Sequence, residues 1–153
     1  MKRNLIVLAA FLFVSIACER DDLCLEKPSA SVNAVFYNNV TQQREPLEIS
    51  VLFNSDTIIE TQTTDSLLIP LPVHTDDFKY VFIKHQGNSA NPDTVRIRFG
   101  IGEQFISKAC GFKTVYHNLQ MNLTPDNDNW IQQIDITNPE VITDTVNHVK
   151  IYH

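Results

Sequence analysis

The sequence predicts an all-β protein, an antiparallel β-sandwich of about eight or nine strands with immunoglobulin-like or Greek-key connections. Its composition favours strands, because Thr, Val and Ile make up 36 of the 136 residues from Cys18 onward, whereas Ala contributes only four. Apolar and polar residues also alternate with a period of two at several places, and no window of a dozen residues shows helical periodicity. A small closed barrel is the alternative architecture.

The first half of the expected domain contains five candidate strands separated by clusters of Asn, Asp, Ser and Gly. They are residues 31–37, 47–53, 57–62, 67–73 and 78–85. In the second, apolar residues alternate with Glu48 and Ser50, which is typical of a strand with one buried face. The fourth contains Pro70 and Pro72, which cannot donate ladder hydrogen bonds, so we expect it at a sheet edge. The fifth is apolar on both parities at its centre, which predicts a strand covered on both faces.

The second half of the domain shows the cleanest alternation. Val95, Ile97 and Phe99 are separated by two arginines, as expected for a half-buried strand. The short segment 100–102, Gly-Ile-Gly, is interpreted as a bulge or turn between two strands, because it lacks the third glycine and the helix of a dinucleotide site. The candidate strands here are residues 95–99, 104–110, 114–123, 130–136 and 149–151, which gives ten candidates for the eight or nine strands expected.

The N-terminus has the features of an export signal. Lys2 and Arg3 precede an apolar run at residues 5–17, and acidic residues follow it at once. The run is shorter than the roughly 20 residues that span a bilayer, and it has no polar face that would suit a buried core helix. We therefore expect residues 1–17 to be a signal peptide that is removed.

The end of this run, Ser15-Ile16-Ala17-Cys18, resembles the lipobox of bacterial lipoproteins. The resemblance implies that Cys18 becomes the lipid-bearing first residue, which would anchor the protein to a membrane. Residues 19–22, Glu-Arg-Asp-Asp, resemble the signal that sends lipoproteins of Bacteroidetes to the cell surface; the alternative is a solvated acidic linker. The expected location is the outer membrane, with the protein facing the periplasm or exposed at the surface.

The two remaining cysteines, Cys24 and Cys110, are an even number in a chain expected to enter an oxidising compartment, which predicts one disulfide. A redox pair or a metal site is the alternative, but neither cysteine lies in a C-x-x-C motif or close to a histidine in the sequence. The expected organisation is thus a signal peptide at 1–17, a lipidated linker at 18–30 and a β-sandwich at 31–153.

Motifs that carry chemistry are mostly missing from the sequence, so no cofactor and no metal are expected. A formal net charge of −6 argues against a nucleic-acid partner, because neutralising phosphates requires a basic face.

Three local features have a structural interpretation. His117 alternates in step with the apolar residues of its expected strand, so we expect a hydrogen-bonded, partly buried residue rather than a metal ligand. Residues 126–129 lack the rest of a calcium loop and are interpreted as a solvated turn. Trp130 is expected in the core or at its rim, with a sugar platform as the alternative.

An Asp, a hydroxyl residue and an aliphatic residue occur in succession four times. The pattern resembles the acceptor sequence for O-glycosylation of exported Bacteroidetes proteins, which makes Thr57, Ser66, Thr94 and Thr145 candidate glycan sites. An all-β chain also produces this pattern by chance, because Asp favours turns and Thr-Val or Thr-Ile favours the strand that follows.

Three segments together carry a resemblance to a known family. Residues 18–24, Cys-Glu-Arg-Asp-Asp-Leu-Cys, residues 106–113 and residues 148–151 are similar to an uncharacterised lipoprotein family of flavobacterial type. The resemblance implies a lipidated Cys18 and a disulfide between Cys24 and Cys110. It implies no activity, because the family is a domain of unknown function.

Three functions remain compatible with these features. The first is a non-enzymatic, lipid-anchored binding or accessory module whose partner is another envelope protein. The second is a hydrolase acting on glycan or envelope material, with Asp76 or Asp77 working together with His85 or His117. The third is a purely structural envelope lipoprotein.

Overall fold

The computed structural model describes residues 23–153, so the expected signal peptide and Cys18 lie outside the described residues. Within them the chain is all-β, with two packed sheets, and this confirms the predicted sandwich. No helix in the described residues is long and apolar enough to cross a membrane. The strands are β1 (Ser31–Tyr37), β2 (Leu47–Phe53), β3 (Asp56–Thr64), β4 (Ser66–Pro70), β5 (Asp77–Gln86), β6 (Ser89–Ser107), β7 (Gly111–Leu123), β8 (Gln133–Ile136) and β9 (Val149–Tyr152).

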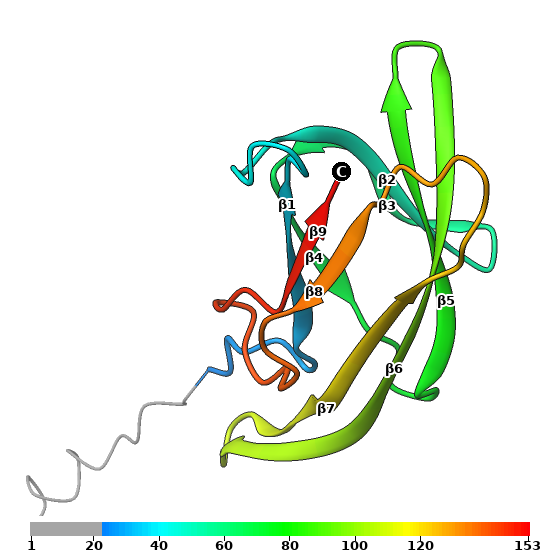
Figure 1. Cartoon of the computed structure of the whole chain (residues 1–153). Coiled ribbons are helices and arrows are strands. Elements are labelled where there is room, and N and C mark those ends of the chain that lie inside the picture. The colour runs from blue at the N-terminus through cyan, green and yellow to red at the C-terminus, as the bar shows by residue number, and fades with distance from the viewer. Residues whose placement is uncertain (1–22) are drawn as a thin grey trace, which may run out of the picture.

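The larger sheet has the order β3-β2-β5-β6-β7, and the smaller one has the order β4-β1-β9-β8 (Figure 1). Strands β5, β6 and β7 are joined in succession by two hairpins, and β2 lies against the free side of β5. The chain passes from one sheet to the other after β1, β3, β4 and β7. As expected from its prolines, β4 lies at a sheet edge.

One pair of strands departs from the antiparallel expectation. Strands β1 and β9 pair in parallel, with Ala34 opposite Val149 and Phe36 opposite Ile151. All four of these side chains are buried. Hydrophobic alternation reports which face of a strand is buried but not the direction of its neighbour, so the sequence pattern could not distinguish the two arrangements.

The core between the sheets contains a continuous series of aromatic rings. Phe53, Phe78, Phe99 and Tyr116 contact one another in turn, edge to face, with ring centroids 4.8–5.8 Å apart. Trp130 is also buried, and its indole Nε1–H donates a hydrogen bond of 3.3 Å to the carbonyl oxygen of Phe82. Trp130 is therefore a core residue, as predicted, and is not available as a sugar platform.

Residues 104–110 do not form the separate strand that was expected. Strand β6 continues through Gly100 and Gly102 to Ser107, and residues 108–110 form the turn to β7. The predicted bulge is present as a register shift between Arg98 and Gly100, opposite Asn118, whose φ is 55°. Gly102 leaves space for the ring of His117, because a Cβ atom there would lie 2.7 Å from Nε2 of that histidine.

The expected turn at residues 126–129 is fastened to the sheet by a buried carboxylate. Asp93 accepts hydrogen bonds from the backbone N–H of Ile131 at 2.7 Å and from the side-chain amide of Asn129 at 3.2 Å. Within the turn, Asn129 Oδ1 accepts the backbone N–H of Asp126. The Asp-Asn cluster therefore satisfies its own backbone and directs Trp130 into the core.

His148 gives the fold an acid-sensitive contact. Its ring is completely buried, and Nδ1 accepts the backbone N–H of Asn33 at 2.9 Å. Burial lowers the pKa of His148, although the charge of Asp144 opposes this effect. Below pH 6.5 the unfolded chain thus binds a proton at this residue that the folded chain does not, and folding stability decreases as the pH falls.

We therefore expect the free energy of unfolding to decrease between pH 7.5 and pH 5.5, by up to about 1.4 kcal/mol per pH unit for one histidine. The variant His148→Asn, whose amide oxygen can replace Nδ1 as the acceptor, should flatten this dependence in urea titrations. The matched change His74→Asn alters an exposed residue and should leave the slope of unfolding free energy against pH as it is in the unaltered chain. An equal slope in His148→Asn and the unaltered chain would contradict the assignment.

Candidate functional site

The segment before β1 is fixed to the sandwich. A disulfide joins Cys24 to Cys110 in the turn between β6 and β7, with the two Cα atoms 5.0 Å apart. The backbone of Pro28 and Ala30 pairs with Thr114 through hydrogen bonds of 2.9 and 3.0 Å. The structure thus contains the expected disulfide and fastens the described part of the expected linker to the edge of β7.

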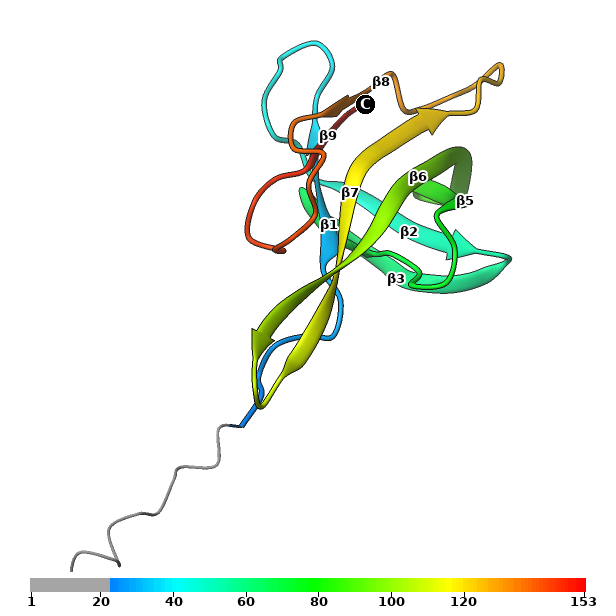
Figure 2. The same ribbon diagram turned by 90° about the horizontal axis from the view of Figure 1, so that it is seen from below.

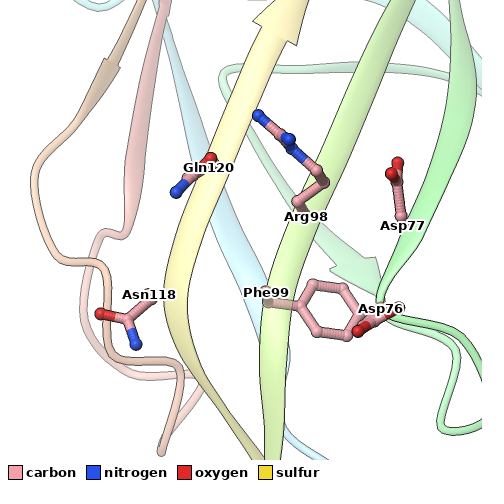
Figure 3. A pocket seen from close by; sticks show the side chains of 6 residues that line it. All are labelled: Asp76, Asp77, Arg98, Phe99, Asn118 and Gln120. Carbon is pink, nitrogen blue, oxygen red and sulfur yellow. The ribbon is translucent and has the colours of Figure 1, made fainter.

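A hollow of about 340 Å³ opens on the outer side of the larger sheet (Figure 3). Its location follows from strand register, since Asp77 of β5 lies opposite Arg98 of β6, which in turn lies opposite Gln120 of β7. These three side chains are exposed, and Phe99, the residue after Arg98, also lines the hollow although its ring is buried among Phe78 and Tyr116. The lining residues are Asp76, Asp77, Arg98, Phe99, Asn118 and Gln120.

The charges of this pocket are partly matched. Two guanidinium nitrogens of Arg96 donate hydrogen bonds to the carboxylate of Asp77, and one of them, Nε, lies 2.8 Å from Oδ1. This contact lowers the pKa of the Asp77 carboxyl, and the charges of Arg98 and Lys79 lower it further. In the part of the chain that the structure describes, no carboxylate lies within 4 Å of the guanidinium of Arg98. The pocket therefore offers the guanidinium of Arg98 and the carboxylate of Asp76 to a ligand, beside the amides of Asn118 and Gln120.

The histidines proposed as partners of Asp76 and Asp77 do not line this pocket. His85 lies eight residues along β5 from Asp77, about 27 Å away at the usual rise of a strand, and its Nε2 is 2.9 Å from the hydroxyl of Ser50. His117 is half-buried and pairs with Glu140, whose pKa is lowered mainly by this hydrogen bond. Both aspartates line the pocket, but neither histidine does.

The four candidate glycan acceptors differ in accessibility. Thr57 and Thr145 are exposed, whereas Ser66 and Thr94 are partly buried within β4 and β6. The aspartates before Thr94 and Thr145 have structural contacts of their own. Asp93 is the buried carboxylate described above, and Asp144 pairs with Lys27 at 2.7 Å.

Among residues 23–153, no group of three or more His, Cys, Asp or Glu side chains is arranged to hold a metal ion.

The pocket residues Arg98, Asn118 and Gln120 were not predicted as site residues. The alternation of β6 did place Arg98 on the outer face, and only the strand order reveals that β7 lies beside it and supplies the two amides.

Comparison with protein families places most of the chain in one of them. Residues 46–153 match the model of a family described as a family of unknown function (DUF6452). This segment contains β2 to β9 and every residue that lines the pocket. No curated protein and no solved structure matches the chain.

Proposed function

We propose that this chain, which belongs to the family of unknown function DUF6452, is a lipid-anchored binding module of the cell envelope and not an enzyme. The sequence Ser15-Ile16-Ala17-Cys18 supports an anchor at Cys18, and the acidic residues that follow support an outer-membrane lipoprotein of the Bacteroidetes type. The net charge of −6 supports a partner other than nucleic acid.

The pocket on the larger sheet is the observation that carries the binding role. Arg98 has its guanidinium available beside two side-chain amides, which suits a partner that presents carboxylate or carbonyl oxygens. Asp77 is committed to Arg96, and its lowered pKa keeps it ionised at neutral pH, so it is poorly suited to act as a general acid. These properties support recognition of another envelope protein more than glycan hydrolysis, and they require no cofactor.

Photo-crosslinking in native membranes tests this proposal. A photoreactive amino acid replaces Gln120, which is exposed and lines the pocket, and a matched chain carries it at Gln62, which is exposed on β3. We expect one envelope protein to be captured in stoichiometric amount from position 120 and not from position 62. Recovery of the protein alone from both positions would overturn the binding role and leave the structural lipoprotein.

The variant Arg98→Ala should weaken capture of that partner about tenfold or more, because a hydrogen bond to a charged group contributes roughly 1.5–3 kcal/mol. Arg44→Ala is the control, since Arg44 is an exposed arginine that does not line the pocket. The measurement is the amount of crosslinked partner at equal abundance of the two variants. Equal capture by both would show that Arg98 does not contact the partner.

Glycosylation is a further part of the proposal, and accessibility favours Thr57 and Thr145 as the acceptors. The intact mass of protein from its native host should exceed the acylated polypeptide by at least one glycan. The double variant Thr57→Val/Thr145→Val should lose this excess, whereas Thr94→Val should retain it. A native mass explained by polypeptide and acyl chains alone would exclude glycan at all four positions.

A further inference from the structure

The hairpin of β6 and β7 carries an apolar surface beyond the sandwich. Phe105 and Phe112 lie opposite each other in the register and are 56 % and 64 % exposed, with ring centroids 5.4 Å apart. Phe112 is four residues before Tyr116 on β7, so the two side chains lie on the same face of the strand, and Tyr116 is completely buried between the sheets. The core-facing side of β7 therefore continues past the end of the core, where the smaller sheet does not cover it (Figure 2).

The N-terminal segment adds to this surface. Leu23 and Leu25 are 82 % and 86 % exposed, and they flank Cys24, which the disulfide fixes at the turn of the hairpin. Figures 1 and 2 both show this segment running beside the tip of β6 and β7. Two leucines and two phenylalanines thus gather at one end of a molecule whose remaining large apolar residues are mostly buried.

The distance to Cys18 indicates what covers this surface. Five residues separate Cys18 from Cys24, so the covalent chain cannot place them more than about 22 Å apart. If Cys18 bears the lipid, the disulfide keeps the hairpin tip close to the bilayer in which the acyl chains are buried. Aromatic and leucine side chains are also those that enter the headgroup region favourably.

We propose that the tip formed by Leu23, Leu25, Phe105 and Phe112 inserts into the lipid interface and sets the orientation of the domain on the membrane. This inference rests on the proposed lipid anchor at Cys18. The contact is apolar, so zwitterionic lipids are sufficient for insertion of the tip, and added salt has little effect on it. The opposite end of the molecule, which includes the loop around Val40, then points away from the membrane (Figure 1).

Tryptophan fluorescence tests the insertion on the acylated full chain in phosphatidylcholine vesicles with brominated acyl chains. The native Trp130 is buried in the core and provides the background signal. The reporter is Phe112→Trp, and the control is Val40→Trp, since Val40 is 88 % exposed at the other end. We expect brominated lipid to lower the reporter's added fluorescence about twofold or more, because interfacial side chains lie roughly 5–10 Å deep. The control should show no loss.

The outcomes separate the inserted tip from the anchor. An intact mass without acyl chains would refute the proposed anchor, and the tip proposal with it. Acylated protein in which the reporter and the control respond alike would overturn the inserted tip while leaving the anchor intact. Blue-shifted reporter emission without vesicles, at concentrations where the chain dimerises, would show that a second copy covers the tip and would also overturn it.

Discussion

Removing the disulfide with Cys24→Ser/Cys110→Ser is expected to lower the free energy of unfolding by about 4–5 kcal/mol in the loop-entropy model. The two cysteines are 86 residues apart, so the bond closes a long loop in the unfolded chain and removes many of its conformations. Small domains are stable by roughly 5–15 kcal/mol, so this is a large share of the total. Urea unfolding followed by circular dichroism measures the loss.

The double variant should still fold, because Cys24 is exposed, Cys110 is half-buried and neither belongs to the hydrophobic core. Reduction of the unaltered protein should lower the urea midpoint of unfolding to the same value as in the double variant, since it opens the same loop. A urea midpoint that is unchanged by both treatments would contradict the loop-entropy estimate for this bond.

Phe82→Ala is expected to destabilise the domain by about 3–5 kcal/mol, because it leaves a cavity in a packed interior. Phe82 lies in β5, a central strand of the larger sheet, and its side chain is completely buried. Its backbone carbonyl also accepts the indole N–H of Trp130, so a shift of β5 would disturb the neighbouring core. The unfolding midpoint in urea should decrease accordingly.

The matched change is Phe112→Ala at the hairpin tip. This phenylalanine is mostly exposed, so its loss should change stability by no more than about 0.5 kcal/mol. The two variants therefore separate a residue that holds the fold from one that we propose to contact lipid. Equal destabilisation by both would place Phe112 among the residues that support the sandwich.

Much of the fold could be predicted because alternation reports burial directly. Strand β1 has the predicted bounds, and the alternation at Val95, Ile97 and Phe99 corresponds to three buried side chains separated by exposed arginines. The bounds of β6 could not be predicted, because Gly100-Ile101-Gly102 is compatible with a bulge or with a turn between two strands. Only the pairing with β7, with its register shift opposite Asn118, shows that one strand continues.

The candidate site was less predictable for a related reason. Arg98, Asn118 and Gln120 converge only because β7 lies beside β6, and residue order does not specify strand order. The pairing of Asp77 with Arg96 is similarly a cross-strand contact, 19 residues apart in sequence. The disulfide was easier to predict, because counting cysteines in a chain expected to be exported leaves few possible pairings.

The parallel pair of β1 and β9 has a consequence for the order of events during synthesis. Strand β1 lies between β4 and β9, so its second neighbour becomes available only when residues 149–152 have been synthesised. Until then the backbone of β1 has only one of its two neighbouring strands, and contacts between residues this distant in sequence form slowly. Newly made chains therefore spend a period with β1 incompletely paired, and an unpaired strand edge at this stage favours aggregation.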